Sequence, residues 1–284
     1  MILKAFTQMT RNKTRCFGLL VGLLLSLTTH AAKVDTVMVQ SASMDKGVKV
    51  VYVIPEKAMG KDAKACPVIY LLHGHGGDAK AWINIKPNLP QIADEKGIII
   101  ACPDGKNSWY WDSPKNSKMR YETFISSELV NYTDTHYKTI ANRKGRAITG
   151  LSMGGHGALW NAIRHPDVFG AAGSTSGGVD IRPFPQNWNM KDQLGEMAEN
   201  KAVWDSHTVI NLVDGLENGR LALIIDCGEG DFFLEVNKAL HQRLLEAGID
   251  HDFITRPGQH NNSYWNNSID YQILFFYKFF QRGK

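Results

Sequence analysis

The chain alternates short apolar runs with longer amphipathic stretches, and this alternation restricts the possible fold more than any other feature. The continuous apolar runs cover 67–72, 98–102, 146–151, 169–174, 221–227 and 251–255. Such runs are typical of parallel strands that are covered on both faces. Stretches with helical periodicity lie between them, at 121–137, 155–164, 231–248 and 263–281. The pattern predicts an α/β fold with a mostly parallel central sheet and helices on both faces.

Two segments depart from this alternation. Residues 34–39 and 48–54 alternate apolar with polar positions, which predicts an antiparallel pair of strands at the start of the fold. Residues 180–219 separate two predicted strands by more chain than one crossover helix needs. We interpret this segment as an insertion that could cap a pocket, although a plain surface excursion with two helices also fits. Residues 33–284 are predicted to form a single domain.

The first 32 residues have the layout of a secretory signal. Four basic residues and no acidic residue come before an apolar run at 17–27, and small residues follow at 29–32. The run of eleven residues is shorter than the roughly 20 that span a bilayer. We therefore expect residues 1–32 to be a cleaved signal peptide and the protein to be periplasmic or extracellular. An uncleaved N-terminal anchor is the alternative.

Removal of this leader makes the chain electrically neutral. The full chain has 32 basic and 28 acidic residues, and the four basic residues of the leader account for the difference of 32 − 28 = 4. Charge thus gives no reason to expect a nucleic-acid partner or stable membrane insertion. Three cysteines remain, Cys66, Cys102 and Cys227, in apolar surroundings and without metal-binding spacing. We interpret them as small buried residues, and a disulfide between two of them stays open.

The run Gly150-Leu-Ser-Met-Gly154 joins a predicted strand to a predicted helix rich in small residues. A strand, a tight turn with a central serine and a helix form the nucleophile elbow of α/β-hydrolases, in which flanking glycines relieve crowding. Ser152 is therefore the expected nucleophile. The backbone N–H of Met153, at the start of the helix, is expected to donate to the oxyanion.

A nucleophilic serine needs a base and a carboxylate that orients the base. In α/β-hydrolases the acid and then the histidine follow the serine, on loops after later strands. Asp231 follows the run 221–227 and His260 follows the run 251–255, so both have the expected order and place. Asp226, inside the strand, and Glu229, on the same loop as Asp231, are the alternative acids.

A second oxyanion donor is expected on the loop after the run 67–72. This loop reads His73-Gly-His-Gly-Gly-Asp78, and its glycines permit a close approach of the backbone to a ligand. The N–H of His75 is the best candidate, with Gly74 and Gly76 as alternatives. No G-K-[ST] sequence follows, which argues against a phosphate-binding loop.

Aromatic residues gather after the same strands. Trp82 follows the glycine-rich loop, Trp109 follows the run 98–102, and Trp265 follows His260. Flat rings suit an aryl or sugar-like group, so these three tryptophans are candidate substrate-binding residues. Ordinary packing under the loops is the alternative for each.

Several blocks in order resemble a known family. They are LLHGHGGDAKAW (71–82), NSWYWDSP (107–114), RYETFISSEL (120–129), ITGLSMGGHGAL (148–159), HPDVFGAAGSTSGG (165–178) and CGEGDFFLEVN (227–237). They are similar to the putative esterase (esterase D-like) family of α/β-hydrolases over about 37–280, and most to its tributyrin and cinnamoyl (feruloyl) esterase branch. The resemblance implies a triad of Ser152, Asp231 and His260 with oxyanion donors on the glycine-rich loop and after the serine.

The resemblance also implies an activity. We expect an exported serine carboxylesterase that acts on carbohydrate-linked acetyl or feruloyl esters or on short-chain acyl esters. The substrate is expected to be a small molecule or an ester linked to a polysaccharide. No metal and no organic cofactor is expected. A thioesterase similar to S-formylglutathione hydrolase and an acyltransferase are the alternatives within the fold. A non-catalytic carbohydrate-binding domain on a hydrolase fold is the alternative outside enzymes. The sequence leaves the oligomeric state open.

Overall fold

A computed structural model describes residues 32–282. Its centre is an eight-stranded sheet in the order β1-β2-β4-β3-β5-β6-β7-β8. The strands are β1 (Lys33–Ser41), β2 (Lys46–Ile54), β3 (Val68–Leu72), β4 (Ile99–Pro103), β5 (Arg146–Gly150), β6 (Ala171–Thr175), β7 (Ala222–Gly228) and β8 (Asp252–Arg256). β1 and β2 pair antiparallel and β2 joins β4 antiparallel, whereas β3 to β8 run parallel. The predicted mostly parallel sheet with an antiparallel start is confirmed.

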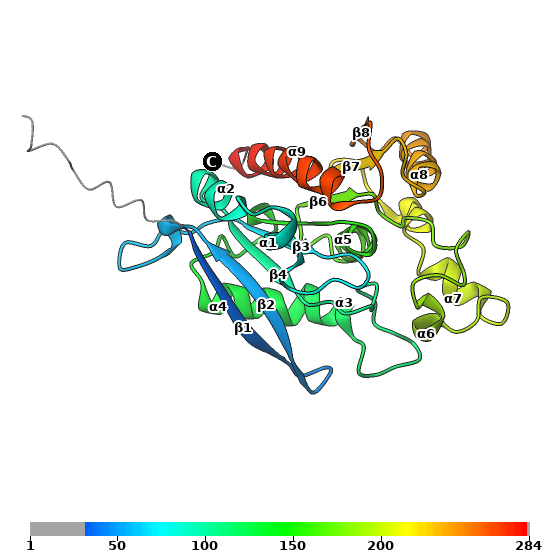
Figure 1. The fold of residues 1–284 in the computed structure, drawn as a ribbon, viewed down its shortest axis with the longest axis horizontal. Coiled ribbons are helices and arrows are strands. Elements are labelled where there is room, and N and C mark those ends of the chain that lie inside the picture. The colour runs from blue at the N-terminus through cyan, green and yellow to red at the C-terminus, as the bar shows by residue number, and fades with distance from the viewer. Residues whose placement is uncertain (1–31, 283–284) are drawn as a thin grey trace, which may run out of the picture. The chain divides into compact units, whose positions relative to one another are not determined.

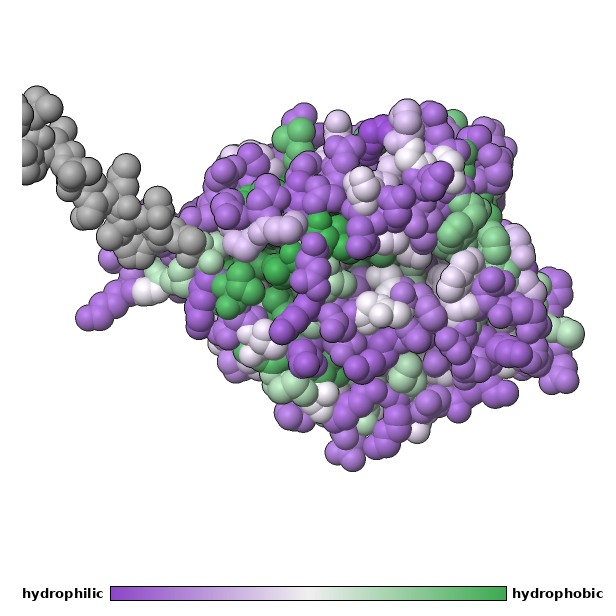
Figure 2. All heavy atoms as spheres, viewed as in Figure 1, coloured by the Kyte–Doolittle hydropathy of each residue, from purple (hydrophilic) through white to green (hydrophobic). Residues whose placement is uncertain are grey.

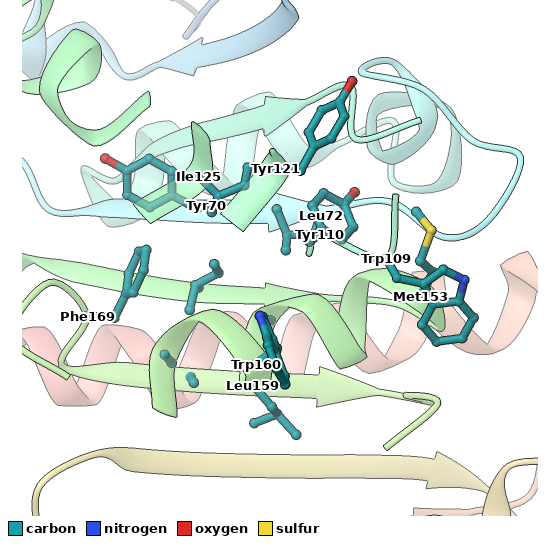
Figure 3. Packing of buried hydrophobic residues seen from close by; sticks show 14 of the residues in the cluster. Tyr70, Leu72, Trp109, Tyr110, Tyr121, Ile125, Met153, Leu159, Trp160 and Phe169 are labelled. Atoms are coloured by element: carbon teal, nitrogen blue, oxygen red, sulfur yellow. The ribbon is translucent and has the colours of Figure 1, made fainter. Parts of the chain in front are cut away.

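Helices cover both faces of this sheet (Figure 1). α1 (Ala81–Ile85), α2 (Leu89–Lys96) and α9 (Asn262–Gln281) lie on one face. The other face carries α3 (Tyr121–Thr123), the π-helical turn Phe124–Glu128, α4 (Leu129–His136), α5 (Met153–Arg164) and α8 (Leu234–Glu246). Neighbouring side chains of each buried strand therefore point into different cores. Tyr70 and Leu72 belong to the core on the α5 face (Figure 3), and Ile69 and Leu71 belong to the core on the α9 face. This explains the unbroken apolar runs in the sequence.

The helix predicted at 231–248 begins later than expected. Asp231 is not in the helix, because its Oδ1 accepts the N–H of Phe233 at 2.8 Å in the turn before α8. The helix ends before Gly248, which has a φ of +67°. The late start leaves Asp231 on a loop after β7, at the carboxyl edge of the sheet.

Short helices make up the 180–219 segment. They are α6 (Met190–Leu194), α7 (Lys201–Ser206) and the 3₁₀ helix Val209–Gly215. Its apolar residues Met190, Trp204 and Val213 join the core on the α5 face of the sheet. The segment is thus packed onto the body of the fold by its own buried side chains.

The described surface is mostly hydrophilic on the face shown in Figure 2, where apolar residues gather in a patch on the side of β1 and β2. Val34 and Met38 of β1 are among the exposed large apolar residues. Among residues 32–282, no helix is both long enough and apolar enough to cross a membrane. The predicted leader, 1–32, falls outside the described residues except for Ala32.

Candidate active site

Ser152 occupies the sharp turn between β5 and α5. Its backbone has φ 55° and ψ −119°, a left-handed conformation that is strained for any residue other than glycine. The N–H of Ser152 donates to the carbonyl of Thr175 on β6 at 2.9 Å, which holds the turn against the neighbouring strand. The turn places Ser152 at the carboxyl edge of the sheet and at the N-terminus of α5.

The glycines that flank Ser152 are required by close backbone contacts. A Cβ on Gly150 would lie 2.6 Å from the carbonyl oxygens of Gly154 and Leu72. A Cβ on Gly154 would lie 2.6 Å from the carbonyl oxygen of His73 and would also meet that of Leu72. Real side chains do not make such contacts with backbone, so both positions demand glycine. The backbone of the turn therefore lies in close contact with the end of β3, where the glycine-rich loop begins.

A continuous hydrogen-bonded chain runs from Ser152 to a buried carboxylate. His260 Nε2 lies 2.9 Å from Ser152 Oγ, and His260 Nδ1 lies 2.8 Å from Asp231 Oδ2. Because an ionised carboxylate can only accept, Nδ1 carries the proton and Nε2 is free to accept the serine hydroxyl. The Asp231 side chain is fully buried and that of His260 is 14% exposed. The three residues predicted for the triad are therefore brought together.

The two alternative acids lie elsewhere. Asp226, within β7, forms a buried ion pair with Arg256 and accepts hydrogen bonds from Ser268 Oγ at 2.6 Å and from the Tyr264 hydroxyl at 3.3 Å. Glu229 is exposed. Neither carboxylate is hydrogen-bonded to His260, so the geometry selects Asp231.

The loop of residues 73–78, called here the glycine loop, runs beside Ser152. Within the described chain, neither the N–H of His75 nor that of Met153 donates to a protein acceptor. The N–H of Gly76, an alternative donor, is used by Asn107 Oδ1 at 2.9 Å. His75 and Met153 therefore keep the N–H groups that an oxyanion would need, and Gly74 stays an alternative.

Buried His73 holds the start of the glycine loop. Its Nδ1 donates to the carbonyl of Gly74 at 2.7 Å, and its Nε2 accepts the N–H of Gly105 at 2.8 Å. The Tyr110 hydroxyl donates to the carbonyl of His73 at 3.1 Å. These hydrogen bonds hold the start of the glycine loop in place. They were not predicted from the sequence, because Gly105 and Tyr110 lie on a separate segment of the chain.

Comparison with known proteins agrees with this geometry. The family model described as "Putative esterase" matches residues 41–276, which is most of the chain. The chain belongs to the putative esterase family. The predicted family and the predicted α/β-hydrolase fold are confirmed.

Several individual proteins are similar to this chain. An esterase of Mycobacterium tuberculosis is 29% identical over 68% of this chain and 48% of its own length. The chain thus spans about half the length of the first curated relatives it matches. An acetyl esterase of Caldicellulosiruptor saccharolyticus is 26% identical over 76% of this chain and 85% of its own. A solved ferulic acid esterase is 27% identical with a TM-score of 0.76, covering 88% of this chain and 98% of that one. The related proteins thus include an acetyl esterase and a ferulic acid esterase.

A cavity of about 300 Å³ opens beside Ser152. Its walls combine the glycine loop, the two catalytic candidates and apolar side chains; they are Gly74–Gly77, Ala81, Ile85, Leu151, Ser152, Trp188, His260, Asn262 and Trp265. Trp265 is the one predicted substrate-binding tryptophan among these lining residues. The Trp265 and His260 rings are perpendicular to each other, with centroids 5.0 Å apart and planes at 89°.

The predictions for Trp82 and Trp109 as substrate-binding residues are wrong in this structure. Each is 1% exposed, and neither lines the cavity. Trp82 Nε1 donates to the carbonyl of Leu72 at 2.8 Å, and Trp109 Nε1 donates to the carbonyl of Trp188 at 3.1 Å. Figure 3 shows Trp109 among the buried core residues. Both rings fill space under the loops that carry the site, so packing explains them.

Sequence reasoning missed two aromatic residues that do lie at the site, Trp188 and Phe232. Trp188 lines the cavity, and the Phe232 ring lies 4.2 Å from the His260 ring, centroid to centroid. Trp188 stood within the 180–219 segment, and Phe232 directly follows Asp231. Adjacency to the predicted acid was the available signal for Phe232.

Burial shifts the pKa values of two ionisable side chains in the core, His156 and Cys102. Burial lowers the pKa of His156 to about 3, so this ring is neutral. Its Nδ1 donates to the carbonyl of Gly178 at 2.9 Å and its Nε2 accepts from Trp111 Nε1 at 2.8 Å, which leaves no free nitrogen for chemistry. Burial raises the pKa of the Cys102 thiol to about 12. Within residues 32–282, no group of three or more His, Cys, Asp or Glu side chains is arranged to hold a metal ion.

Proposed function

We propose that the chain is an exported serine carboxylesterase that hydrolyses carbohydrate-linked acetyl or feruloyl esters, or short-chain acyl esters, through an acyl-enzyme. The observation that carries the proposal is the hydrogen-bonded chain Ser152–His260–Asp231 on a strained strand-to-helix turn. That arrangement suits attack by a serine hydroxyl on a carbonyl carbon.

In the proposed mechanism, Ser152 Oγ attacks the ester carbonyl while its proton passes to His260 Nε2. The N–H groups of His75 and Met153 donate to the oxyanion, and Asp231 stabilises the charged imidazole. The bond to the alcohol oxygen then breaks, and the alcohol leaves with the proton from His260. A water molecule attacks the acyl-enzyme by the same route, which releases the acid and restores Ser152.

The substrate part of the proposal rests on relatives and on the leader sequence. An acetyl esterase and a ferulic acid esterase are among the related proteins. The signal-like residues 1–32 favour extracytoplasmic ester substrates over a cytosolic thioester. The mass of the protein isolated from its native host tests export, because cleavage after Ala32 predicts a chain that begins at Lys33.

A substrate panel tests the activity. The purified protein is assayed with p-nitrophenyl acetate, acetylated xylan, methyl ferulate and S-formylglutathione, each alongside Ser152→Ala. We expect serine-dependent hydrolysis of the oxygen esters to exceed that of S-formylglutathione. A preference for S-formylglutathione, transfer of the acyl group to an added alcohol in place of water, or binding without turnover would each contradict the proposal.

A further inference from the structure

Two consecutive residues of the 180–219 segment have a left-handed backbone. Trp188 has φ 51° and Asn189 has φ 56°. This conformation is unfavourable for an L-residue such as tryptophan, and it persists only where surrounding contacts determine it. Strain of this kind is concentrated at functional sites. The contacts that hold this dipeptide, and the place to which they bring the Trp188 ring, are therefore informative.

One contact holds the backbone of the dipeptide. The indole N–H of Trp109 donates to the carbonyl of Trp188 at 3.1 Å. Trp109 is itself left-handed, with φ 56°, and its ring stacks on Trp111 with centroids 5.5 Å apart. The backbone of Trp188 is therefore held by a buried pair of stacked tryptophans, Trp109 and Trp111.

A second contact ties the dipeptide to the glycine loop. Asn189 Nδ2 donates to Asp192 Oδ2 at 2.9 Å, and Asn189 Oδ1 lies 2.9 Å from His75 Nε2. Because the carboxylate of Asp192 accepts hydrogen bonds, the amide NH₂ of Asn189 faces it and the amide oxygen faces His75. His75 therefore donates to Asn189. This bond docks the 180–219 segment directly beside the proposed oxyanion donor.

The docked segment places the Trp188 ring at the mouth of the catalytic site. The ring lines the same cavity as Ser152 and His260. It stacks on Phe232, with centroids 5.6 Å apart and planes inclined by only 17°. Phe232 in turn lies against His260 and is 52% exposed. The two rings come from segments about forty residues apart in the chain and meet beside the reacting atoms.

We propose that Trp188 and Phe232 form an aryl-binding subsite that selects esters with a planar aromatic ring within a few bonds of the ester carbonyl. The inference rests on the proposed function and names its substrate class. A cavity of about 300 Å³ is at the small end for ligand sites, and it suits one ring with a short linker better than an acetyl group alone. An incoming ring can stack on or meet the edge of the exposed Phe232 ring and the half-buried Trp188 ring.

The ring can belong to the acid or to the alcohol of the ester, and three substrates distinguish these cases. Methyl ferulate carries the ring on the acid, phenyl acetate carries it on the alcohol, and methyl butyrate has no ring. The variants are Trp188→Ala, which retains a Cβ at the left-handed position, and Phe232→Ala. Leu245→Ala is the matched control, because Leu245 is 54% exposed and lies on α8 at a distance in sequence from the site residues.

We expect Trp188→Ala and Phe232→Ala to lower kcat/KM for one or both ring-bearing esters by about 10-fold or more. Activity on methyl butyrate should fall less than activity on these esters, so the ratio of kcat/KM for the ring-bearing ester to that for methyl butyrate should drop. Leu245→Ala should leave this ratio unchanged, and Trp188→Phe should restore most of it. An equal loss on all three esters, or no loss on either ring-bearing ester, would overturn the subsite.

A binding measurement separates this inference from the proposed function. Ferulate binding is measured by calorimetry in Ser152→Ala and in Ser152→Ala combined with Trp188→Ala. The subsite predicts weaker binding of about 10-fold in the double variant, whether or not the wild-type protein hydrolyses any ester. Phenol is measured in the same way as the alcohol-side ring, and equal affinity of the two proteins for both ferulate and phenol would refute the subsite. Inactivity of the wild type on all esters would refute only the proposed function.

Discussion

Two buried aspartates near the end of β7 bind different partners, and replacing each with asparagine tests whether its role is in activity or in stability. Asp231 Oδ2 binds His260 Nδ1 at 2.8 Å. Asp226 instead pairs with Arg256, whose side chain is 16% exposed, and accepts a hydrogen bond from Ser268. The first contact belongs to the proposed chemistry and the second ties β7 to β8 and α9.

The structure sets the expected size of each effect. Asp231→Asn keeps the shape of the side chain but removes the acceptor that fixes the His260 tautomer, a change that lowers kcat by about 10⁴-fold in serine protease triads, or about 5.4 kcal/mol of barrier. Asp226→Asn leaves the Arg256 guanidinium largely buried without its counter-charge. Breaking a buried pair in this way costs about 3–5 kcal/mol of folding stability.

The assay measures both quantities on both variants, with kcat for p-nitrophenyl acetate and the free energy of unfolding in urea. We expect Asp231→Asn to lose activity with stability close to wild type, and Asp226→Asn to lose stability while its folded fraction stays active. The reasoning is refuted if Asp226→Asn loses about 10⁴-fold in kcat at unchanged stability while Asp231→Asn remains active.

Three further predictions concern the turn, the glycine loop and acid stability. Gly154→Ala should lower kcat by about 100-fold, because the added Cβ collides with backbone and displaces Ser152. Gly215→Ala is the control and should leave kcat unchanged, because a Cβ at Gly215 meets no atom within 4 Å. Equal kcat values for the two variants would contradict the steric argument. Asn189→Gly, which accepts the left-handed φ, removes the bond that docks the Trp188 segment on the glycine loop, so it should lower kcat/KM for ring-bearing esters more than for methyl butyrate; unchanged kinetics on all esters would contradict this. Burial opposes ionisation of Glu122, but hydrogen bonds from three neighbouring side chains outweigh it and lower the pKa to about 2 from 4.5. A carboxyl pKa that is lower in the folded state stabilises the fold above about pH 4.5, so on the order of 2 kcal/mol of the free energy of unfolding should be lost as the pH falls from 4.5 toward 2. Glu122→Gln should reduce this pH dependence, measured by urea unfolding at several pH values. The same pH dependence in wild type and variant would contradict the prediction.

The positions of the strands along the chain and the triad residues could be predicted from the sequence because both depend on local patterns. Each buried strand reads as an unbroken apolar run, since both faces are covered. Ser152, Asp231 and His260 follow such runs, and the carboxyl ends of parallel strands share one edge of the sheet. A residue placed directly after a predicted strand is thus located in space before the structure is known.

The aromatic surroundings could not be predicted in the same way. Trp82 and Trp109 follow strands too, but their indole N–H groups are satisfied by distant carbonyls and their rings are buried. Trp188 reaches the site through a left-handed backbone in a long segment with no periodic pattern. Contacts of this kind depend on how loops far apart in the chain pack together, which periodicity does not report.

Covalent labelling of Ser152 tests the central claim most directly. The folded protein is treated with a fluorophosphonate probe, and the modified residue is located by mass spectrometry, with Ser152→Ala and Ser263→Ala as paired variants; Ser263 is an exposed serine near His260. The account predicts a single adduct on Ser152, retained in Ser263→Ala and absent from Ser152→Ala together with all hydrolysis of p-nitrophenyl acetate. Labelling at another residue, or hydrolysis that survives in Ser152→Ala, would contradict it.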